Sequence, residues 1–213
     1  MGIRTRKIRK KELGFIHNFI PSTKRTNEVI LLLHGTGGDE KYLLKIGRRI
    51  SPGAAVLTPR GNVFDNGSNR FCLRSPDGVF DMADLKLRTD ELAKFIRNAA
   101  KLYKFDLSRL SVIGYSNGAS IAAAVILTHP GTVKRCVLFH PALPLMPETL
   151  PDLSSIRVLI TYGDNDKVVK PGESQALANV LKQCRAQVVV YRHSAQHELE
   201  ESEILAAKTF LAS

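Results

Sequence analysis

A serine lies at the centre of Gly114-Tyr115-Ser116-Asn117-Gly118, between a short apolar run and a segment of small and apolar residues. The five residues match the pattern G-x-S-x-G, with a predicted strand before it and a predicted helix after it. Such a turn is sharp and exposes the serine hydroxyl, while the helix N-terminus favours developing negative charge. Ser116 is therefore a candidate nucleophile. The alternative is a serine–glycine turn without chemistry.

A second loop, His34-Gly35-Thr36-Gly37-Gly38, follows the apolar run at 29–33. In folds that carry a serine at a strand–helix turn, an early loop and the residue after the serine each donate a backbone N–H to the oxyanion. Thr36 and Asn117 are the candidate donors. A phosphate-binding loop is the alternative, but the segment has neither G-x-x-x-x-G-K nor G-x-G-x-x-G.

An acid and a base follow two further predicted strands. Asp164 and Asp166 come after the apolar run at 158–162, and either carboxylate could orient a histidine and balance its charge. His193 and His197 lie between the last strand and the last helix, and His197 is preferred because it stands where the helix begins. Of the remaining histidines, we expect His34 to pack under the glycine-rich loop, and His140 to have a structural place rather than a metal.

Strands and helices alternate along most of the chain. The patterns predict an edge strand at 15–20 and further strands at 29–33, 54–58, 110–115, 135–139, 158–162 and 187–191, with helices at 41–50, 82–103, 120–127, 174–183 and 198–211. This order is typical of an α/β fold, a mainly parallel sheet with helices on both faces, whose sites lie beyond the carboxyl ends of the strands. Residues 61–81 read as one long loop, which is usually functional. The serine, acid and histidine occur in the order expected of the α/β-hydrolase fold.

Length and charge limit the remaining possibilities. The 213 residues suit one domain, which we place at 13–213 after a basic segment at 1–12. The net charge is +11, yet no aromatic residue interleaves the basic segment, so a nucleic-acid partner is not expected. No apolar run reaches the length of a membrane span, and three scattered cysteines argue against disulfides and zinc. We therefore expect a cytoplasmic protein.

The chain resembles the phospholipase/carboxylesterase family of small α/β-hydrolases, bacterial carboxylesterases more than eukaryotic thioesterases. The segments that carry the resemblance are LLLHGTGGDE at 31–40, PRGNV at 59–63, RFC at 71–73, GVFD at 78–81, GYSNGASIAAA at 114–124, LFHPALP at 138–144 and GDNDKVV at 163–169. The resemblance implies a triad of Ser116, Asp166 and His197, with an oxyanion hole at Thr36 and Asn117. It also implies catalysis without a metal or cofactor, and a possible homodimer. Gln196 departs from the family, which usually has glycine before the histidine.

The expected substrate is a small ester with a short to medium acyl chain, because the segment at 140–156 is too short for a separate lid domain. Candidate apolar walls come from the long loop and from the loop after the strand at 135–139, and they are Phe64, Phe71, Phe80, Leu143, Leu145 and Met146. An acyl-protein thioesterase or lysophospholipase is an alternative that needs a longer acyl channel. A basic binding protein on an inactive scaffold is the alternative that is not an enzyme.

Overall fold

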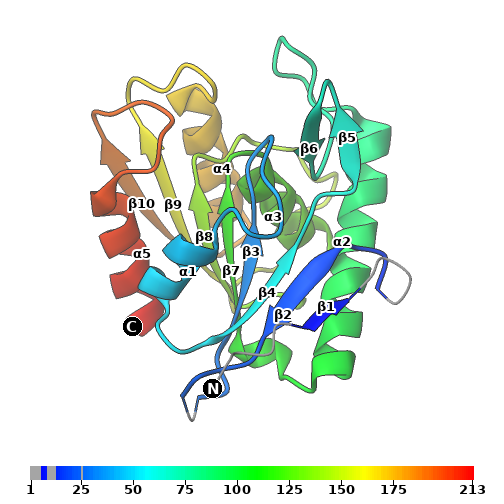
Figure 1. The fold of residues 1–213 in the computed structure, drawn as a ribbon. Helices are drawn as coiled ribbons and strands as arrows, with labels where there is room; N and C mark the ends of the chain where they lie inside the picture. Colours follow the sequence, from blue (N-terminus) through cyan, green and yellow to red (C-terminus); the bar gives the residue numbers. More distant parts are fainter. Residues whose placement is uncertain (1–5, 9–12, 25) are drawn as a thin grey trace.

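A computed structural model describes residues 6–8, 13–24 and 26–213, and a mainly parallel sheet of eight strands runs through this part of the chain (Figure 1). The strand order is β1-β2-β4-β3-β7-β8-β9-β10, with β1 and β2 antiparallel to their neighbours. The strands are β1 Arg6–Ile8, β2 His17–Ile20, β3 Val29–Leu33, β4 Ala55–Pro59, β7 Leu110–Tyr115, β8 Arg135–Phe139, β9 Arg157–Gly163 and β10 Gln187–His193.

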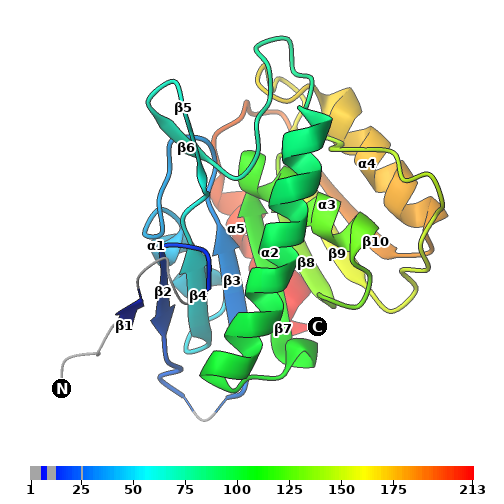
Figure 2. The ribbon, with the colours of Figure 1, turned by 90° about the vertical axis from the view of Figure 1, so that its right-hand side faces the viewer.

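Helices cover both faces of the sheet, as the alternating pattern predicts (Figures 1 and 2). Helices α2 (Met82–Tyr103), α3 (Asn117–Thr128) and α4 (Pro171–Gln183) pack on one face, and α1 (Leu44–Ile50) and α5 (Glu201–Ala212) on the other. Strand β3 shows why a continuous apolar run suits this arrangement. Its odd-numbered residues join the core under α2 and α3, and Ile30 and Leu32 join the core under α1.

The parallel strands bring distant segments together at one edge of the sheet. Strands β3, β7, β8, β9 and β10 pair in parallel, so their carboxyl ends point the same way. The glycine-rich loop at 34–38, Ser116, the loop after β9 and the loop after β10 all start from this edge. The sheet therefore places the sequence-predicted site in one region.

The turn between β7 and α3 is strained and closely packed. Ser116 has φ 52° and ψ −114°, a region that non-glycine residues rarely adopt. A Cβ on Gly118 would lie 2.2 Å from the carbonyl oxygen of Leu33, and one on Gly114 would lie 2.6 Å from that of Gly118. The two glycines thus allow the strand, the helix and the end of β3 to approach closely around the serine.

Two expectations are corrected. The strand predicted at the sheet edge over 15–20 is β2, and it lies one position inside because β1 pairs with its outer side. Residues 61–81 are not one loop, since β5 (Val63–Asp65) and β6 (Ser68–Arg70) form a hairpin. Its two-residue turn, Asn66-Gly67, has positive φ at both positions, as a hairpin turn of this length favours.

Most of the basic segment at 1–12 lies outside the described residues, which include only Arg6–Ile8 of it. The boundary between that segment and the domain therefore stays a prediction. Among the helices of the described residues, none has both the length and the apolar character that crossing a membrane requires.

Replacing Gly118 with alanine should lower the free energy of unfolding by about 1–3 kcal/mol, because the new methyl group would overlap the backbone of β3. Urea denaturation followed by far-UV circular dichroism measures the change. Gly172→Ala is the matched control. A Cβ there meets nothing within 4 Å, and alanine favours the helix, so stability should stay equal or rise. Equal stabilities of Gly118→Ala and wild type would show that the close packing is not required.

Candidate active site

Ser116, His197 and Asp166 form a continuous chain of hydrogen bonds at the carboxyl edge of the sheet. His197 Nε2 lies 2.9 Å from Ser116 Oγ, and His197 Nδ1 lies 2.7 Å from Asp166 Oδ2. An ionised carboxylate only accepts hydrogen bonds, so Nδ1 carries the proton and Nε2 faces the serine with its lone pair. This tautomer can take a proton from the Ser116 hydroxyl.

Asp166 is buried, and donors hold both of its oxygens. Oδ1 accepts from the backbone N–H groups of Val168 and Val169 at 2.8 and 2.9 Å, and Oδ2 accepts from His197 and from His140. Burial alone would raise the pKa of Asp166, but these hydrogen bonds outweigh it and the net shift is downward. The carboxylate is therefore ionised and fixed in orientation.

Asp164 and His193, the alternative acid and histidine predicted in these two loops, have other partners. Asp164 pairs with Arg192 on the surface at 2.8 Å. His193 ends β10 and faces Glu203, with its Nε2 3.4 Å from a Glu203 oxygen. The carbonyl of His197, by contrast, accepts a hydrogen bond from the Tyr115 hydroxyl at 3.0 Å, which fixes the backbone that carries the base.

Two residues at the cavity beside Ser116 have backbone N–H groups that are open to a ligand. Thr36 and Asn117 both line the adjoining cavity, and within the described part of the chain neither backbone N–H has a hydrogen-bond acceptor. Buried His34 supports the loop that carries Thr36. Its Nδ1 donates to the carbonyl of Gly35 and its Nε2 accepts from the N–H of Gly61, at 2.7 and 3.0 Å. Burial lowers the pKa of His34, which keeps this tautomer neutral.

The side chain of Asn117 binds the backbone of the segment that follows β6. Its Oδ1 accepts from the N–H of Phe71 at 2.7 Å, and its Nδ2 donates to the carbonyl of Cys72 at 2.9 Å. Asn117 is buried, so these bonds satisfy polar groups that water cannot reach. They hold the segment after β6 against the start of α3 and so set one wall of the cavity.

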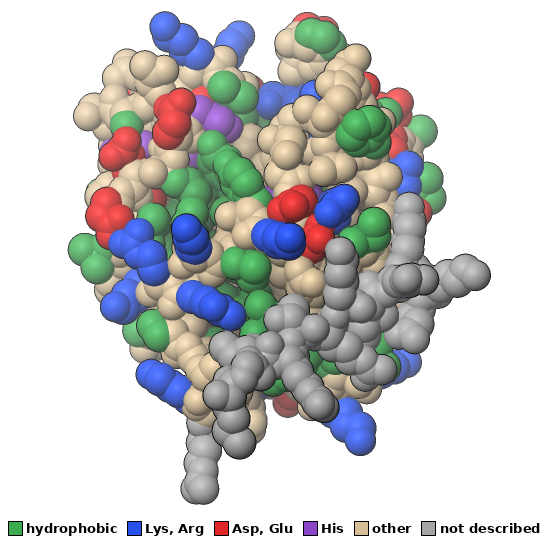
Figure 3. Space-filling model, in the orientation of Figure 1, with side chains coloured by type: hydrophobic (Ala, Val, Ile, Leu, Met, Phe, Trp, Pro, Cys, Tyr) green, Lys and Arg blue, Asp and Glu red, His purple; other side chains and the backbone are tan. Residues whose placement is uncertain are grey.

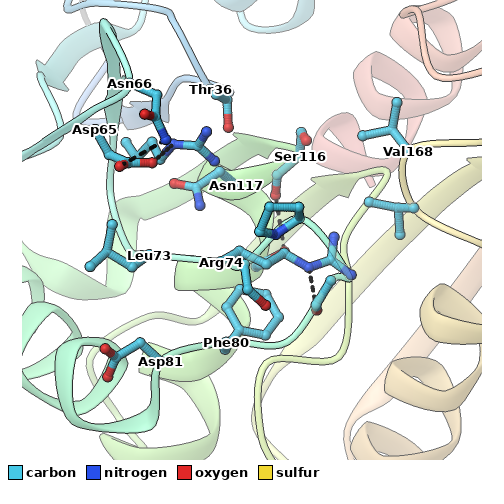
Figure 4. Close-up of a pocket in the computed structure, with 16 residues that line it drawn as sticks. Thr36, Asp65, Asn66, Leu73, Arg74, Phe80, Asp81, Ser116, Asn117 and Val168 are labelled. Atoms are coloured by element: carbon cyan, nitrogen blue, oxygen red, sulfur yellow. Dashed lines mark hydrogen bonds and ion pairs between the residues drawn. The ribbon is translucent and has the colours of Figure 1, made fainter.

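A cavity of about 600 Å³ opens at Ser116 (Figure 4). Figure 3 shows the surface hollowed between two lobes at the edge where the parallel strands end. Of the six wall residues predicted, Phe80 lines the cavity. Its lining does not include the other five: Phe71 is buried beside His34, Phe64 and Met146 are largely exposed, and Leu143 and Leu145 pack against the core. Apolar lining comes instead from Leu73, Val168 and Val169.

The two arginines that line the cavity form ion pairs with carboxylates. Arg70 Nε lies 3.3 Å from Asp65 Oδ2, and Arg74 pairs with Glu173 while its Nε donates to the carbonyl of Gly78. Arg60 is not among the lining residues and binds buried Glu40 at 2.7 Å. The arginines of the site thus already carry carboxylate partners.

Sequence reasoning missed a second buried pair behind the site. His140 Nδ1 lies 2.8 Å from Asp166 Oδ2, and His140 Nε2 lies 3.2 Å from Glu203 Oε1. Asp166 lies 26 positions after His140 and Glu203 lies 63 positions after it, and no motif joins the three residues. Only the pairing of β8 beside β9, and of α5 beneath them, brings them together.

Comparison with known families agrees with this fold. The model of a family described as Phospholipase/Carboxylesterase matches residues 16–213. The chain belongs to the phospholipase/carboxylesterase family. It is therefore a carboxylesterase-like hydrolase with the α/β-hydrolase fold.

Individual relatives cover nearly the whole chain. MhqD of Bacillus subtilis (strain 168) is 40% identical over 183 residues, 86% of this chain and 92% of MhqD. The carboxylesterase of Bacillus cereus is 38% identical with a TM-score of 0.91, covering 95% of this chain and 96% of that one. A structure of YahD with malic acid is 30% identical with a TM-score of 0.86, covering 92% of this chain and 97% of that one.

Replacing Gln196 with glycine, the residue usual in the family, should not improve the site. Gln196 does not have positive φ, so its turn does not need glycine's freedom. Gln196→Gly should leave kcat/KM unchanged and lower the free energy of unfolding by about 0.4–1 kcal/mol through the more flexible unfolded chain. Ester assays and urea denaturation measure both, with Gln196→Ala as the control for losing the side chain. A rise in kcat/KM specific to glycine would show that the loop is strained.

Proposed function

We propose that this hydrolase is a serine carboxylesterase, which cleaves carboxylic esters of short to medium acyl chains through an acyl-enzyme on Ser116. The observation that carries the proposal is the continuous chain of hydrogen bonds from Ser116 through His197 to Asp166 at the mouth of a cavity. The pKa of Asp166 is lowered, and His197 turns Nδ1 toward this carboxylate and Nε2 toward the serine. The carboxylesterase relatives support the same class of substrate.

The first half of the reaction acylates the serine. His197 Nε2 accepts the hydroxyl proton while Ser116 Oγ attacks the carbonyl carbon of the ester. The carbonyl oxygen becomes an oxyanion that accepts hydrogen bonds from the N–H groups of Thr36 and Asn117. Asp166 balances the positive charge on His197. When the tetrahedral intermediate collapses, His197 gives its proton to the leaving alcohol.

The second half releases the acid. A water molecule enters where the alcohol left, and His197 Nε2 takes one of its protons as the water oxygen attacks the acyl carbon. A second oxyanion forms against the same two N–H groups. Its collapse breaks the bond to Ser116 Oγ, which takes the proton back from His197. No proton or electron is left over, so these residues complete the cycle.

The cavity favours a neutral ester of modest size. Its apolar lining comes from Leu73, Phe80 and the two valines after Asp166, and its volume of about 600 Å³ must hold both acyl and alcohol groups. YahD has been found with malic acid, a dicarboxylate, and Arg70 and Arg74 of this chain offer positive charge to an acidic group. Because both arginines already pair with carboxylates, we favour neutral esters over acidic ones.

Ser116→Ala should lower turnover of p-nitrophenyl acetate by about 10³-fold or more, because no nucleophile remains to form the acyl-enzyme. Steady-state assays measure the loss, with surface variant Ser154→Ala as the matched control that should keep wild-type rates. Equal turnover by Ser116→Ala and wild type would contradict the enzyme mechanism and favour a binding protein on an inactive scaffold.

A series of p-nitrophenyl esters tests the chain length. We expect kcat/KM to be highest for butanoyl and hexanoyl esters and to fall for dodecanoyl and palmitoyl esters, because a long acyl chain would have to contact the charged side chains that line the rest of the cavity. A palmitoyl ester or palmitoyl thioester that is cleaved as well as the hexanoyl ester would instead indicate an acyl-protein thioesterase or lysophospholipase.

A further inference from the structure

His140 lies directly behind the carboxylate of the proposed triad and has no accessible surface. It is the first residue after β8, with φ 50°, and its N–H donates to the carbonyl of Thr161 on β9 at 2.8 Å. Positive φ is uncommon for histidine and is held here by the neighbouring strand. The backbone thus aims the ring between Asp166 and Glu203.

Both ring nitrogens of His140 face carboxylate oxygens. Nδ1 lies 2.8 Å from Asp166 Oδ2, and Nε2 lies 3.2 Å from Glu203 Oε1. Glu203 also accepts hydrogen bonds from the Thr161 hydroxyl and from the N–H of Glu200, as an ionised carboxylate does. A neutral ring would turn one lone pair toward a carboxylate, so the contacts fit a doubly protonated imidazolium.

The electrostatics agree with this protonation state. Burial alone would lower the pKa of His140, but the hydrogen bonds and charges of Glu203 and Asp166 outweigh it and the net shift is upward. Burial would raise the pKa of Glu203, yet His140, the N–H of Glu200 and Thr161 lower it overall. Both buried carboxylates therefore favour the charged form of His140.

Other titratable groups face His140 from each packed element. His197, in the loop before α5, has its ring centroid 5.0 Å away, and His193 on β10 has its centroid 5.6 Å away. Tyr115 on β7 lies edge-on at 6.1 Å. The ring of His140 thus lies directly beside the ring of the proposed base.

We propose that His140, anchored by Glu203, is a positioning residue for ester hydrolysis. Its Nδ1–H holds Asp166 Oδ2 in place beside His197, and its positive charge lies next to the ring of the proposed base. The inference rests on the proposed function, because it describes how the base of that mechanism is held ready.

A metal ion is the competing occupant of this cluster. Ligand atoms of His140, His193 and Glu203 lie within 4.8 Å of one another, as do those of His140, Asp166 and His197. We favour the ion pair because both Glu203 oxygens already accept hydrogen bonds from the protein. His140 Nδ1, too, already faces Asp166.

The decisive variant is His140→Asn. Asparagine accepts positive φ and can offer an amide N–H to Asp166 without a charge. We expect the acidic limb of kcat/KM against pH to move to higher pH by about one unit, because removing a positive charge favours protonation of the neighbouring base. The double variant His140→Asn/Glu203→Gln removes one charge of each sign, so its acidic limb should return toward that of wild type.

If the acidic limb of kcat/KM against pH does not move in His140→Asn and only kcat falls, the result would overturn the proposal in favour of a purely structural role for His140. If the purified wild-type protein contains bound metal and its acidic limb shifts after dialysis against EDTA, the result would overturn the proposal in favour of a metal site. If His140→Asn does not fold, ¹⁵N NMR of wild type decides. One histidine ring with both nitrogens protonated at pH 8 supports the proposal, and none contradicts it.

The two proposals fail separately. Retained turnover in Ser116→Ala would contradict the proposed function itself. If turnover is lost in Ser116→Ala and the acidic limb of kcat/KM does not move in His140→Asn, only the role proposed for His140 would be contradicted.

Discussion

The hydrogen bond between Ser116 Oγ and His197 Nε2 joins two residues that are 81 positions apart in the sequence, and the proposed mechanism depends on it. This hydrogen bond depends on β7, β9 and β10 ending at one edge of a parallel sheet, so that the serine, the aspartate and the histidine all start from that edge. It also depends on the close contact of β7, α3 and β3, where Gly114 and Gly118 leave room for a strained serine. The strand arrangement and the close packing around Ser116 therefore determine both the fold of this region and the proposed chemistry.

Asp166 connects that hydrogen bond to the interior of the protein. A buried carboxylate is costly unless donors satisfy it, and here four donors do so, two from the backbone and two from histidines. Through His140 the network continues to Glu203, whose side chain also caps the first turn of α5. The last helix, which covers one face of the sheet, is thus tied to the proposed acid by buried polar contacts.

The sequence predicted the elements that have strong local signals. Apolar runs located β3, β7 and β8, and the pattern around Ser116 located the turn, because strand burial and tight turns restrict residue type directly. The hairpin of β5 and β6 was missed among turn residues, although Asn66-Gly67 was a usable signal. The pairing of His140 with Glu203 gave no local signal, since it follows from the order of the strands and the placement of α5. Five of the six predicted wall residues do not line the cavity. For Phe64, which is exposed on β5, and Phe71, which is buried just after β6, the missed hairpin accounts for the difference.

The central claim is that one activated serine performs the chemistry, and labelling with a fluorophosphonate tests it most directly. Wild-type protein treated with the probe and digested should carry the phosphonyl group on Ser116, because its hydroxyl lies 2.9 Å from His197 Nε2 and opens into the cavity. His197→Ala should slow the labelling strongly while leaving the protein folded. Modification at another residue, or labelling of Ser116 that is equally fast without His197, would contradict the account.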